Sequence, residues 1–149
     1  MVRINTMFEN IEASAIIDIS KILQNYPEFA DLPTLDIDTF QGLRQLIDDD
    51  LAFSDLVTSY LNSAEKLIDE IQIGFANQDS RQFSLSAHSL KSTSASIGAV
   101  RLSQICNYLE QIGKTGKISI SHNILHLLTN EYEQVIQAIQ IPAIKFMAE

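Results

Sequence analysis

One histidine and one lysine stand three residues apart in the stretch AHSLKSTSASIGA, residues 87–99, which otherwise holds small, hydroxyl-bearing and aliphatic side chains. A neutral imidazole, with an ordinary pKa of about 6.5, is a competent nucleophile at neutral pH. An ammonium group one helical turn away can offset the negative charge of an incoming phosphoryl group. His88 and Lys91 therefore have the chemistry of a phosphoryl-accepting site, with His88 as the nucleophile.

A helical wheel of this stretch places His88 on the solvent side. At about 100° per residue, one line defines the buried face, and His88 lies roughly 140° from it. The residues close to that line are Phe83, Ala87, Leu90, Ser94 and Ile97. We expect an exposed imidazole, an exposed Leu85 that joins a partner-binding patch, and a collar of small residues that lets a concave partner approach. The collar residues are Ser84, Ser92, Ala95 and Ala99.

The chain has no glycine-rich loop of the GxxxxGK[ST] or GxGxxG type. We therefore expect no ATP binding and no kinase activity of its own. The metal ion and the electrostatic stabilisation of phosphoryl transfer must then come from a partner protein.

A second pair of histidines offers a weaker candidate site. His122 and His126 have the i, i+4 spacing of two metal ligands on one helix. The residues between them lack the glutamate of an HExxH motif, and no cysteine or carboxylate completes a recognisable ligand set. We expect these histidines to pack or to be solvated, so the prediction is that the chain has no metal site.

The composition disfavours several classes of partner. The net charge is −9, with 10 basic against 19 acidic residues, which opposes binding to nucleic acid and to anionic membranes. No apolar run approaches the roughly 20 residues of a membrane-spanning helix, and the N-terminal stretch does not read as a secretory signal. The single cysteine, Cys106, reads as a small core residue and cannot form an internal disulfide. These features predict a cytoplasmic protein.

The elements that must position His88 are predicted to be long helices. Only 5 glycines and 3 prolines occur in 149 residues, too few for the turns of a many-stranded fold. Asp79 is the expected N-cap of the helix that carries His88, Gly98 weakens its end, and Asp36 or Asp38 caps a shorter helix. The acidic run at 48–50 reads as a junction between helices. Apolar spacing predicts the other long helices at about 52–76, 100–112 and 121–139, with a possible continuation after Pro142.

These elements predict an all-α protein, an antiparallel four-helix bundle with an additional N-terminal helix. We assign residues 1–34 to an N-terminal helical extension and connector, and residues 35–149 to the bundle. The extension carries an amphipathic stripe of Phe8, Ile11, Ala15, Ile19 and Ile22. It can cap the bundle or pair two chains; we expect capping and a monomer.

The stretch AHSLKSTSASIGA followed by VRLSQICNYLE resembles the histidine-containing phosphotransfer (HPt) domain, whose motif reads approximately AHxLKGSSxxxGAxxLxxxCxxLE. The resemblance is close over 24 residues and looser from about Leu35 to Ile139. The family's glycine four residues after the histidine is Ser92 here, and its next serine is Thr93. The matching positions are His88, Leu90, Lys91, Ser94, Gly98, Ala99, Leu102, Cys106, Leu109 and Glu110.

The resemblance implies a phosphorelay intermediate, without autokinase activity, that belongs to a multistep phosphorelay. His88 would accept a phosphoryl group from a receiver-domain aspartyl phosphate and pass it to another response-regulator receiver, with Mg²⁺ supplied by the receiver. Lys91 would stabilise the phosphoryl charge, and Glu110 sits where the family often has a polar residue able to orient the imidazole. Ser92 adds a hydroxyl to the docking collar, and we expect activity to survive it. The alternative is a degenerate adaptor that binds a receiver or regulator without phosphotransfer.

Overall fold

The computed structural model describes the backbone of residues 19–148 and the side chains of residues 19–140. All regular structure in this part of the chain is helical, as predicted. The first three members of the N-terminal stripe, Phe8, Ile11 and Ala15, lie outside the described residues. The elements in order are α2 (Ile19–Gln24), α3 (Pro27–Ala30), α4 (Ile37–Ile47), α5 (Asp50–Ala76), α6 (Ser80–Ile97), α7 (Val100–Lys114) and α8 (His122–Ala148).

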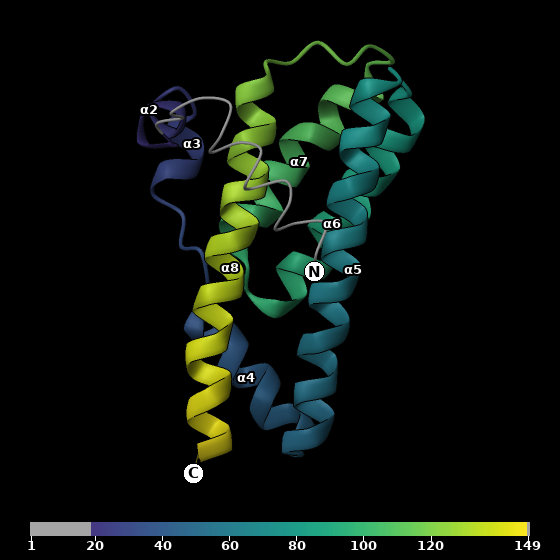
Figure 1. Cartoon of the computed structure of the whole chain (residues 1–149). Helices are drawn as coiled ribbons and strands as arrows, with labels where there is room; N and C mark the ends of the chain where they lie inside the picture. The colour runs from purple at the N-terminus through teal and green to yellow at the C-terminus, as the bar shows by residue number, and fades with distance from the viewer. Residues whose placement is uncertain (1–18, 149) are drawn as a thin grey trace, which may run out of the picture.

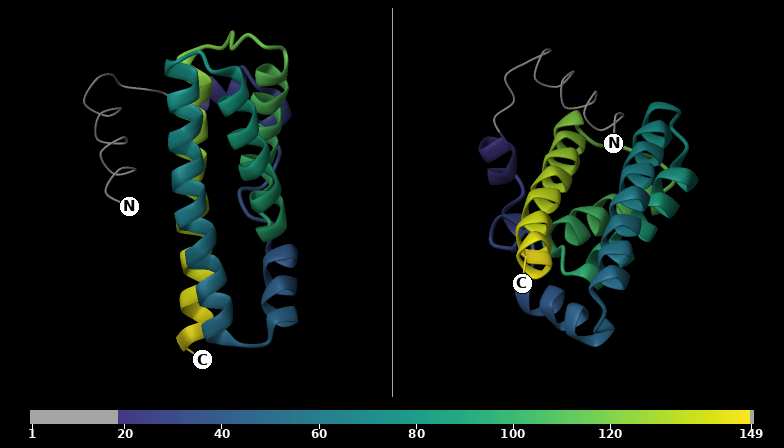
Figure 2. Two further views of the ribbon diagram at one scale, coloured as in Figure 1. Left: turned by 90° about the vertical axis from the view of Figure 1, so that its right-hand side faces the viewer. Right: turned by 60° about the horizontal axis from the view of Figure 1, so that its bottom comes forward.

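The four long helices α5, α6, α7 and α8 form the predicted antiparallel bundle (Figure 1). α6 packs against both α5 and α7, and α8 packs against the same two helices from the other side. Figure 2 shows that α5 and α8 extend beyond α6 and α7 at one end, where α4 lies. The helix that carries His88 thus has a neighbour along each flank and one face left for solvent.

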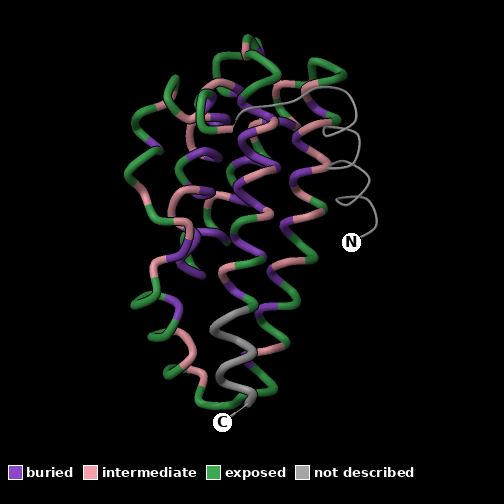
Figure 3. Tube along the Cα trace, turned by 60° about the vertical axis from the view of Figure 1, so that its left-hand side comes forward, coloured by how far each residue is buried: buried purple, intermediate pink, exposed green. Residues whose placement is uncertain are grey.

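Figure 3 shows that buried residues alternate with exposed ones along each long helix. The buried apolar residues form one hydrophobic cluster. The predicted buried face of α6 is confirmed, because all five of its residues are buried. Its one polar member, Ser94, is paired with Tyr60, whose Oη lies 2.8 Å from the Ser94 Oγ. That hydrogen bond satisfies two polar groups that burial would otherwise leave unpaired.

Side-chain caps and left-handed residues define the helix ends. The Asp79 Oδ1 accepts from the backbone N–H of Gln82 at 3.1 Å, which confirms Asp79 as the N-cap of α6. Gly98 ends this helix with a φ of 95°, and an added Cβ there would lie 2.9 Å from the Asp36 carbonyl oxygen. The acidic run is a junction, as predicted: Asp48 closes α4 with a φ of 52°, and Asp49 caps α5. α8 runs past position 142 without a break.

The described part of the N-terminal extension is held against the bundle by Arg101 of α7. Its guanidinium donates to the carbonyl oxygens of Phe29 at 3.0 Å and Ala30 at 3.1 Å, and lies 3.4 Å from the buried carboxylate of Glu131 on α8. The expected connector after Pro27 contains the short helix α3, which begins at that proline. Proline is favourable at a first helical position because its missing N–H would have no intrahelical partner there.

None of the helices in the described part of the chain combines the length and the apolar character needed to cross a membrane.

Candidate functional site

His88 lies on the outer face of α6, and its side chain is 56% exposed. The exposure predicted from the helical wheel is therefore confirmed. The flanking Ala87 and Leu90 are fully buried, so α6 is anchored on both sides of the histidine while the imidazole faces outward. A side chain so placed can be reached by another protein without any opening of the bundle.

Glu110 of α7 lies beneath the imidazole and binds three cationic or potentially cationic groups. Its Oε2 lies 2.8 Å from the Nδ1 of His88 and 3.1 Å from the Nζ of Lys114. Its Oε1 lies 2.6 Å from the Nζ of Lys91. Glu110 is only 2% exposed, because these side chains cover it near the protein surface. The first of these distances brings Glu110 within hydrogen-bonding reach of the imidazole, and its role in orienting the ring stays a prediction.

The surroundings of Glu110 keep it ionised. Burial alone would raise the pKa of this carboxyl group, but the contacts with Lys91, His88 and Lys114 outweigh burial and lower the pKa to about 2. Glu110 is therefore a carboxylate at any physiological pH. A carboxylate can only accept hydrogen bonds, so each group that hydrogen-bonds to Glu110 must be a donor.

The contact with Glu110 selects one tautomer of His88. A neutral imidazole that faces an acceptor-only carboxylate through Nδ1 carries its proton on that nitrogen. The lone pair is then on Nε2, for which no partner is found among the described residues. The ring is thus oriented by its Nδ1, and the nucleophilic Nε2 contacts no polar group in the described part of the chain.

Lys91 is held inside the site. Its side chain is 28% exposed, and its Nζ lies 3.5 Å from the Asn107 Oδ1 as well as 2.6 Å from the Glu110 carboxylate. An ammonium group has three N–H donors. Lys91 can therefore stay bound to Glu110 and still direct a donor toward a group on His88.

Lys114 is a member of the site that sequence reasoning missed. It stands four residues after Glu110 on α7, and its side chain is 59% exposed. A Glu–Lys pair at i, i+4 is a recognisable helical ion pair. That spacing was the signal available in the sequence, because any partner of Glu110 on the same helix face would also lie near His88.

Close packing of α6 on α7 fixes the distance between His88 and Glu110. Gly113 allows this approach, because an added Cβ would lie 2.8 Å from the Cβ of Ser84. The Ser84 Oγ also donates to the carbonyl oxygen of Glu110 at 3.3 Å. Ser84 is accordingly half-buried. It belongs to the contact between α6 and α7 more than to the exposed collar around His88.

The exposure expected of the other collar residues is confirmed in part, and their role in partner binding stays a prediction. Ser92 and Ala95 are exposed on the same side as His88, and Leu85 is an exposed apolar residue at 55%. The expectation for Ala99 is wrong, because this residue is fully buried. The helical wheel assumes one continuous helix through position 99, whereas α6 ends at Ile97 and the left-handed Gly98 turns the chain inward.

His122 and His126 do not form part of a larger ligand cluster. Among the residues that the structure describes, no group of three or more histidine, cysteine or acidic side chains could hold a metal ion. The His122 ring packs edge-on against Phe75, with 5.1 Å between the ring centroids. Burial, together with the neighbouring His122, lowers the pKa of His126.

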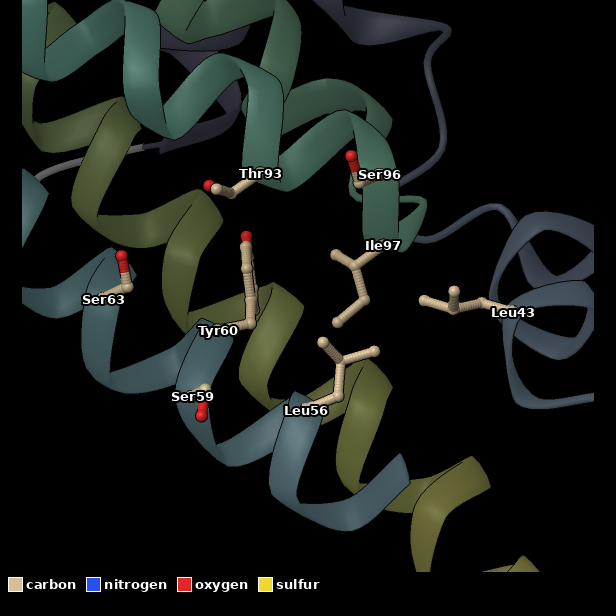
Figure 4. Close-up of a pocket in the computed structure, with 8 residues that line it drawn as sticks. All are labelled: Leu43, Leu56, Ser59, Tyr60, Ser63, Thr93, Ser96 and Ile97. Atoms are coloured by element: carbon tan, nitrogen blue, oxygen red, sulfur yellow. The ribbon is translucent and has the colours of Figure 1, made fainter. Parts of the chain in front are cut away.

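An apolar groove of about 280 Å³ lies beside α6, between α4 and α5 (Figure 4). Its α6 wall is made by Thr93, Ser96 and Ile97, and none of the residues around the Glu110 cluster lines it. Tyr60 contributes its ring to this groove, while its hydroxyl is bound to Ser94. The groove is thus separate from the imidazole and lacks charged side chains.

A family model described as the Hpt domain matches residues 55–138, more than half of the chain. The search of curated proteins found no match.

Two solved structures share the fold. The crystal structure of histidine-containing phosphotransfer protein B (HptB) from Pseudomonas aeruginosa PAO1 is 20% identical, with a TM-score of 0.70 over 76% of this chain and 96% of that one. The X-ray structure of a candidate histidine-containing phosphotransfer protein from rice is 21% identical, with a TM-score of 0.65 over 84% of this chain and 88% of that one.

Proposed function

The chain belongs to the family of Hpt domains, and from this membership we propose that His88 is the residue through which it relays phosphoryl groups. Histidine phosphotransfer in phosphorelays is the function of the family, and Hpt domains interact with the receiver domains of two-component systems. The single observation that carries the proposal is the exposed imidazole of His88, with Nδ1 bound to Glu110 and Nε2 without a partner among the residues that the structure describes.

The proposed reaction is an exchange between a carboxylate and an imidazole. The Nε2 lone pair of His88 attacks the phosphorus of an aspartyl phosphate on a receiver domain, a bond forms between Nε2 and phosphorus, and the receiver's aspartate leaves as a carboxylate. The reverse exchange passes the phosphoryl group to the aspartate of a second receiver. The bound orientation of the ring spares part of the entropic cost of positioning the nucleophile.

Lys91 is proposed to offset the charge of the transferred group from its position beside Glu110. The Mg²⁺ that phosphoryl transfer uses would be supplied by the receiver, as would the remaining electrostatic stabilisation. Since the sequence has no nucleotide-binding loop, we propose that the chain has no autokinase activity. A monomeric cytoplasmic protein fits the acidic composition and the single cysteine.

The docking surface is proposed to be the outer face of α6. It combines the exposed Leu85 with Ser92 and Ala95 around His88, and small side chains leave room for the concave site of a receiver. Ser92 brings a hydroxyl that can donate a hydrogen bond to a phosphoryl oxygen. Ala99 has no part in this surface, because it is buried.

The test is transfer of labelled phosphate from a receiver domain that carries it on its aspartate. We expect label to appear on the wild-type chain, stable to base and labile to acid as a phosphoramidate should be, and to be absent from His88→Gln. The substitution should change the free energy of unfolding by no more than about 1 kcal/mol, because the side chain is exposed and the glutamine amide can still donate a hydrogen bond to Glu110. Matched thermal unfolding curves serve as the control for folding.

The same experiment separates the relay from an adaptor. A receiver that binds the wild type and His88→Gln equally well, and loses no label to either, would show that the chain binds without phosphotransfer. That outcome would sink the proposal, since it leaves the exposed nucleophile without a reaction.

A further inference from the structure

We propose that Glu110 retains the proton on Nδ1 of His88 after phosphorylation, so that the phosphohistidine is held as an imidazolium and passes its phosphoryl group on rapidly. This inference rests on the proposed function and deepens it: Glu110 is a positioning residue that regulates the lifetime of the phosphorylated state. It is based on the contact between Nδ1 of His88 and Oε2 of Glu110, and on the fact that the group in contact is a carboxylate.

The role of Glu110 follows from where the Nδ1 proton and the charge of the ring go during phosphoryl exchange. The form of His88 that can act as a nucleophile is the neutral ring, with its proton on Nδ1. When Nε2 forms its bond to phosphorus, the ring becomes an imidazolium unless the Nδ1 proton departs. When the phosphoryl group later moves to a carboxylate, the electrons of the nitrogen–phosphorus bond return to Nε2 and restore the neutral Nδ1–H ring. If Nδ1 keeps its proton, neither direction requires a proton to be lost or gained.

Protonation of Nδ1 also decides how readily the phosphoryl group leaves. A protonated ring departs as neutral imidazole, whereas an unprotonated ring would have to depart as an imidazolate anion, which is a far poorer leaving group. The unprotonated phosphohistidine is therefore the long-lived form. A side chain that stabilises one form over the other sets the rate of both transfer and spontaneous hydrolysis.

Glu110 stabilises only the protonated form. Its Oε2 lies 2.8 Å from Nδ1, and a carboxylate has no proton to donate to an unprotonated nitrogen. An amide at the same place could turn its NH₂ group toward the ring and stabilise the unprotonated form equally well. With 2% of the side chain exposed, water has little access to replace the carboxylate as the partner of Nδ1.

The lysines keep the carboxylate in place and balance its charge. Lys91 on α6 and Lys114 on α7 are the other charged groups that contact Glu110 in the described part of the chain, at 2.6 Å and 3.1 Å. After phosphorylation, three cationic groups face one carboxylate and a phosphoryl group of about two negative charges. The imidazolium thus forms in surroundings whose charges are nearly balanced, which favours its retention.

The experiment uses the full chain loaded with phosphoramidate, a small donor that phosphorylates imidazole without a receiver. The lifetime of phospho-His88 is followed by ³¹P NMR in the wild type, in Glu110→Gln and in the matched control Glu133→Gln on α8. We expect the wild-type rate of hydrolysis to change little from about pH 6 to about pH 9, and the Glu110→Gln rate to fall steeply, to at least about tenfold below wild type at the upper end. Glu133→Gln should behave as wild type.

A spectroscopic measurement on the wild type makes the test independent of any variant's folding. The ¹⁵N shift of Nδ1 in the phosphorylated wild type should be that of a protonated nitrogen at about pH 8. An unprotonated Nδ1 at this pH, or equal lifetimes and pH profiles in wild type and Glu110→Gln, would overturn the inference.

The donor keeps this test distinct from that of the proposed function. If phosphoramidate loads His88 but no receiver does, the relay fails and the effect of Glu110 on the phosphohistidine is still measured. If neither donor loads His88, both proposals fall.

Discussion

At the scale of single residues, Glu110 should make the free energy of unfolding of this protein depend on pH in the acidic range. Its pKa of about 2 lies below the ordinary value of 4.5, so its native contacts stabilise the fold fully above about pH 4.5. This contribution is lost as the pH falls from about 4.5 to about 2, when the native carboxylate is protonated. The linked free energy is on the order of 3 kcal/mol.

We predict that Glu110→Gln is less stable than the wild type near neutral pH and that the difference closes in acid. The amide lacks the charge that Lys91 and Lys114 bind, so most of the linked free energy should be missing from the variant at about pH 7. Urea unfolding measured at several pH values checks this. A difference that stays constant between about pH 6 and about pH 2 would contradict the role of the carboxylate charge.

Sequence reasoning succeeded for residues whose positions depend on one helix. The exposure of His88 and the burial of Leu90 follow from a wheel because the helix is continuous between them. The wheel failed at Ala99, beyond the left-handed Gly98. Lys114 was missed for a different reason: its i, i+4 spacing from Glu110 is visible in the sequence, but its importance depends on the packing of α7 against α6 that brings Glu110 to His88.

At the scale of helices, the approach of α7 to α6 depends on Gly113. We predict that Gly113→Ala destabilises the fold by about 1–3 kcal/mol, because its Cβ would meet Ser84 and Phe83 at 2.8–3.1 Å and the two helices must move apart. Since α7 carries Glu110, the same change should slow phosphoryl transfer through His88. Thermal unfolding and the receiver assay measure the two effects.

Gly42→Ala is the matched control for that substitution. Gly42 also lies inside a helix, but nothing stands within 4 Å of an added Cβ. We expect a gain of up to about 1 kcal/mol from the better helix propensity of alanine, with no change in transfer. If both substitutions stabilised the protein equally, the close contact between α6 and α7 would not be limiting.

Most helix boundaries could be predicted because they are marked locally. The side-chain caps Asp49 and Asp79 begin α5 and α6, and the predicted start of the long helix was two residues late only because the acidic run was assigned to the junction as a whole. The helix at 27–30 was missed, since one turn is too short to show an apolar period. Its stability comes from Arg101, which lies about seventy residues away in the chain.

At the scale of the whole molecule, Arg101 joins the N-terminal extension to α7 and α8. Burial raises the pKa of Glu131, its partner, even though Arg101 opposes the effect. We predict that Arg101→Met costs about 3–5 kcal/mol, because it leaves that buried carboxylate without a cationic partner and frees the carbonyl groups of α3.

A second substitution and a change of pH test that reason. Adding Glu131→Gln to Arg101→Met should recover part of the loss, and the loss in Arg101→Met alone should shrink as the pH falls and Glu131 is protonated. Chemical unfolding of the two variants provides both comparisons. A double variant as unstable as Arg101→Met would mean that the lost carbonyl contacts, and not the buried charge, hold the extension in place.

The single sulfhydryl of this chain is enclosed at the centre of that same bundle. Cys106 is fully buried, and burial raises the pKa of its thiol, so in the folded protein it is both out of reach and protonated. A thiol reagent can react only with molecules in which α7 has separated from its neighbours. The rate at which a thiol reagent labels Cys106 therefore measures how often the core opens. No probe has to be introduced for this measurement, and the sequence holds no second cysteine that would contribute to the signal.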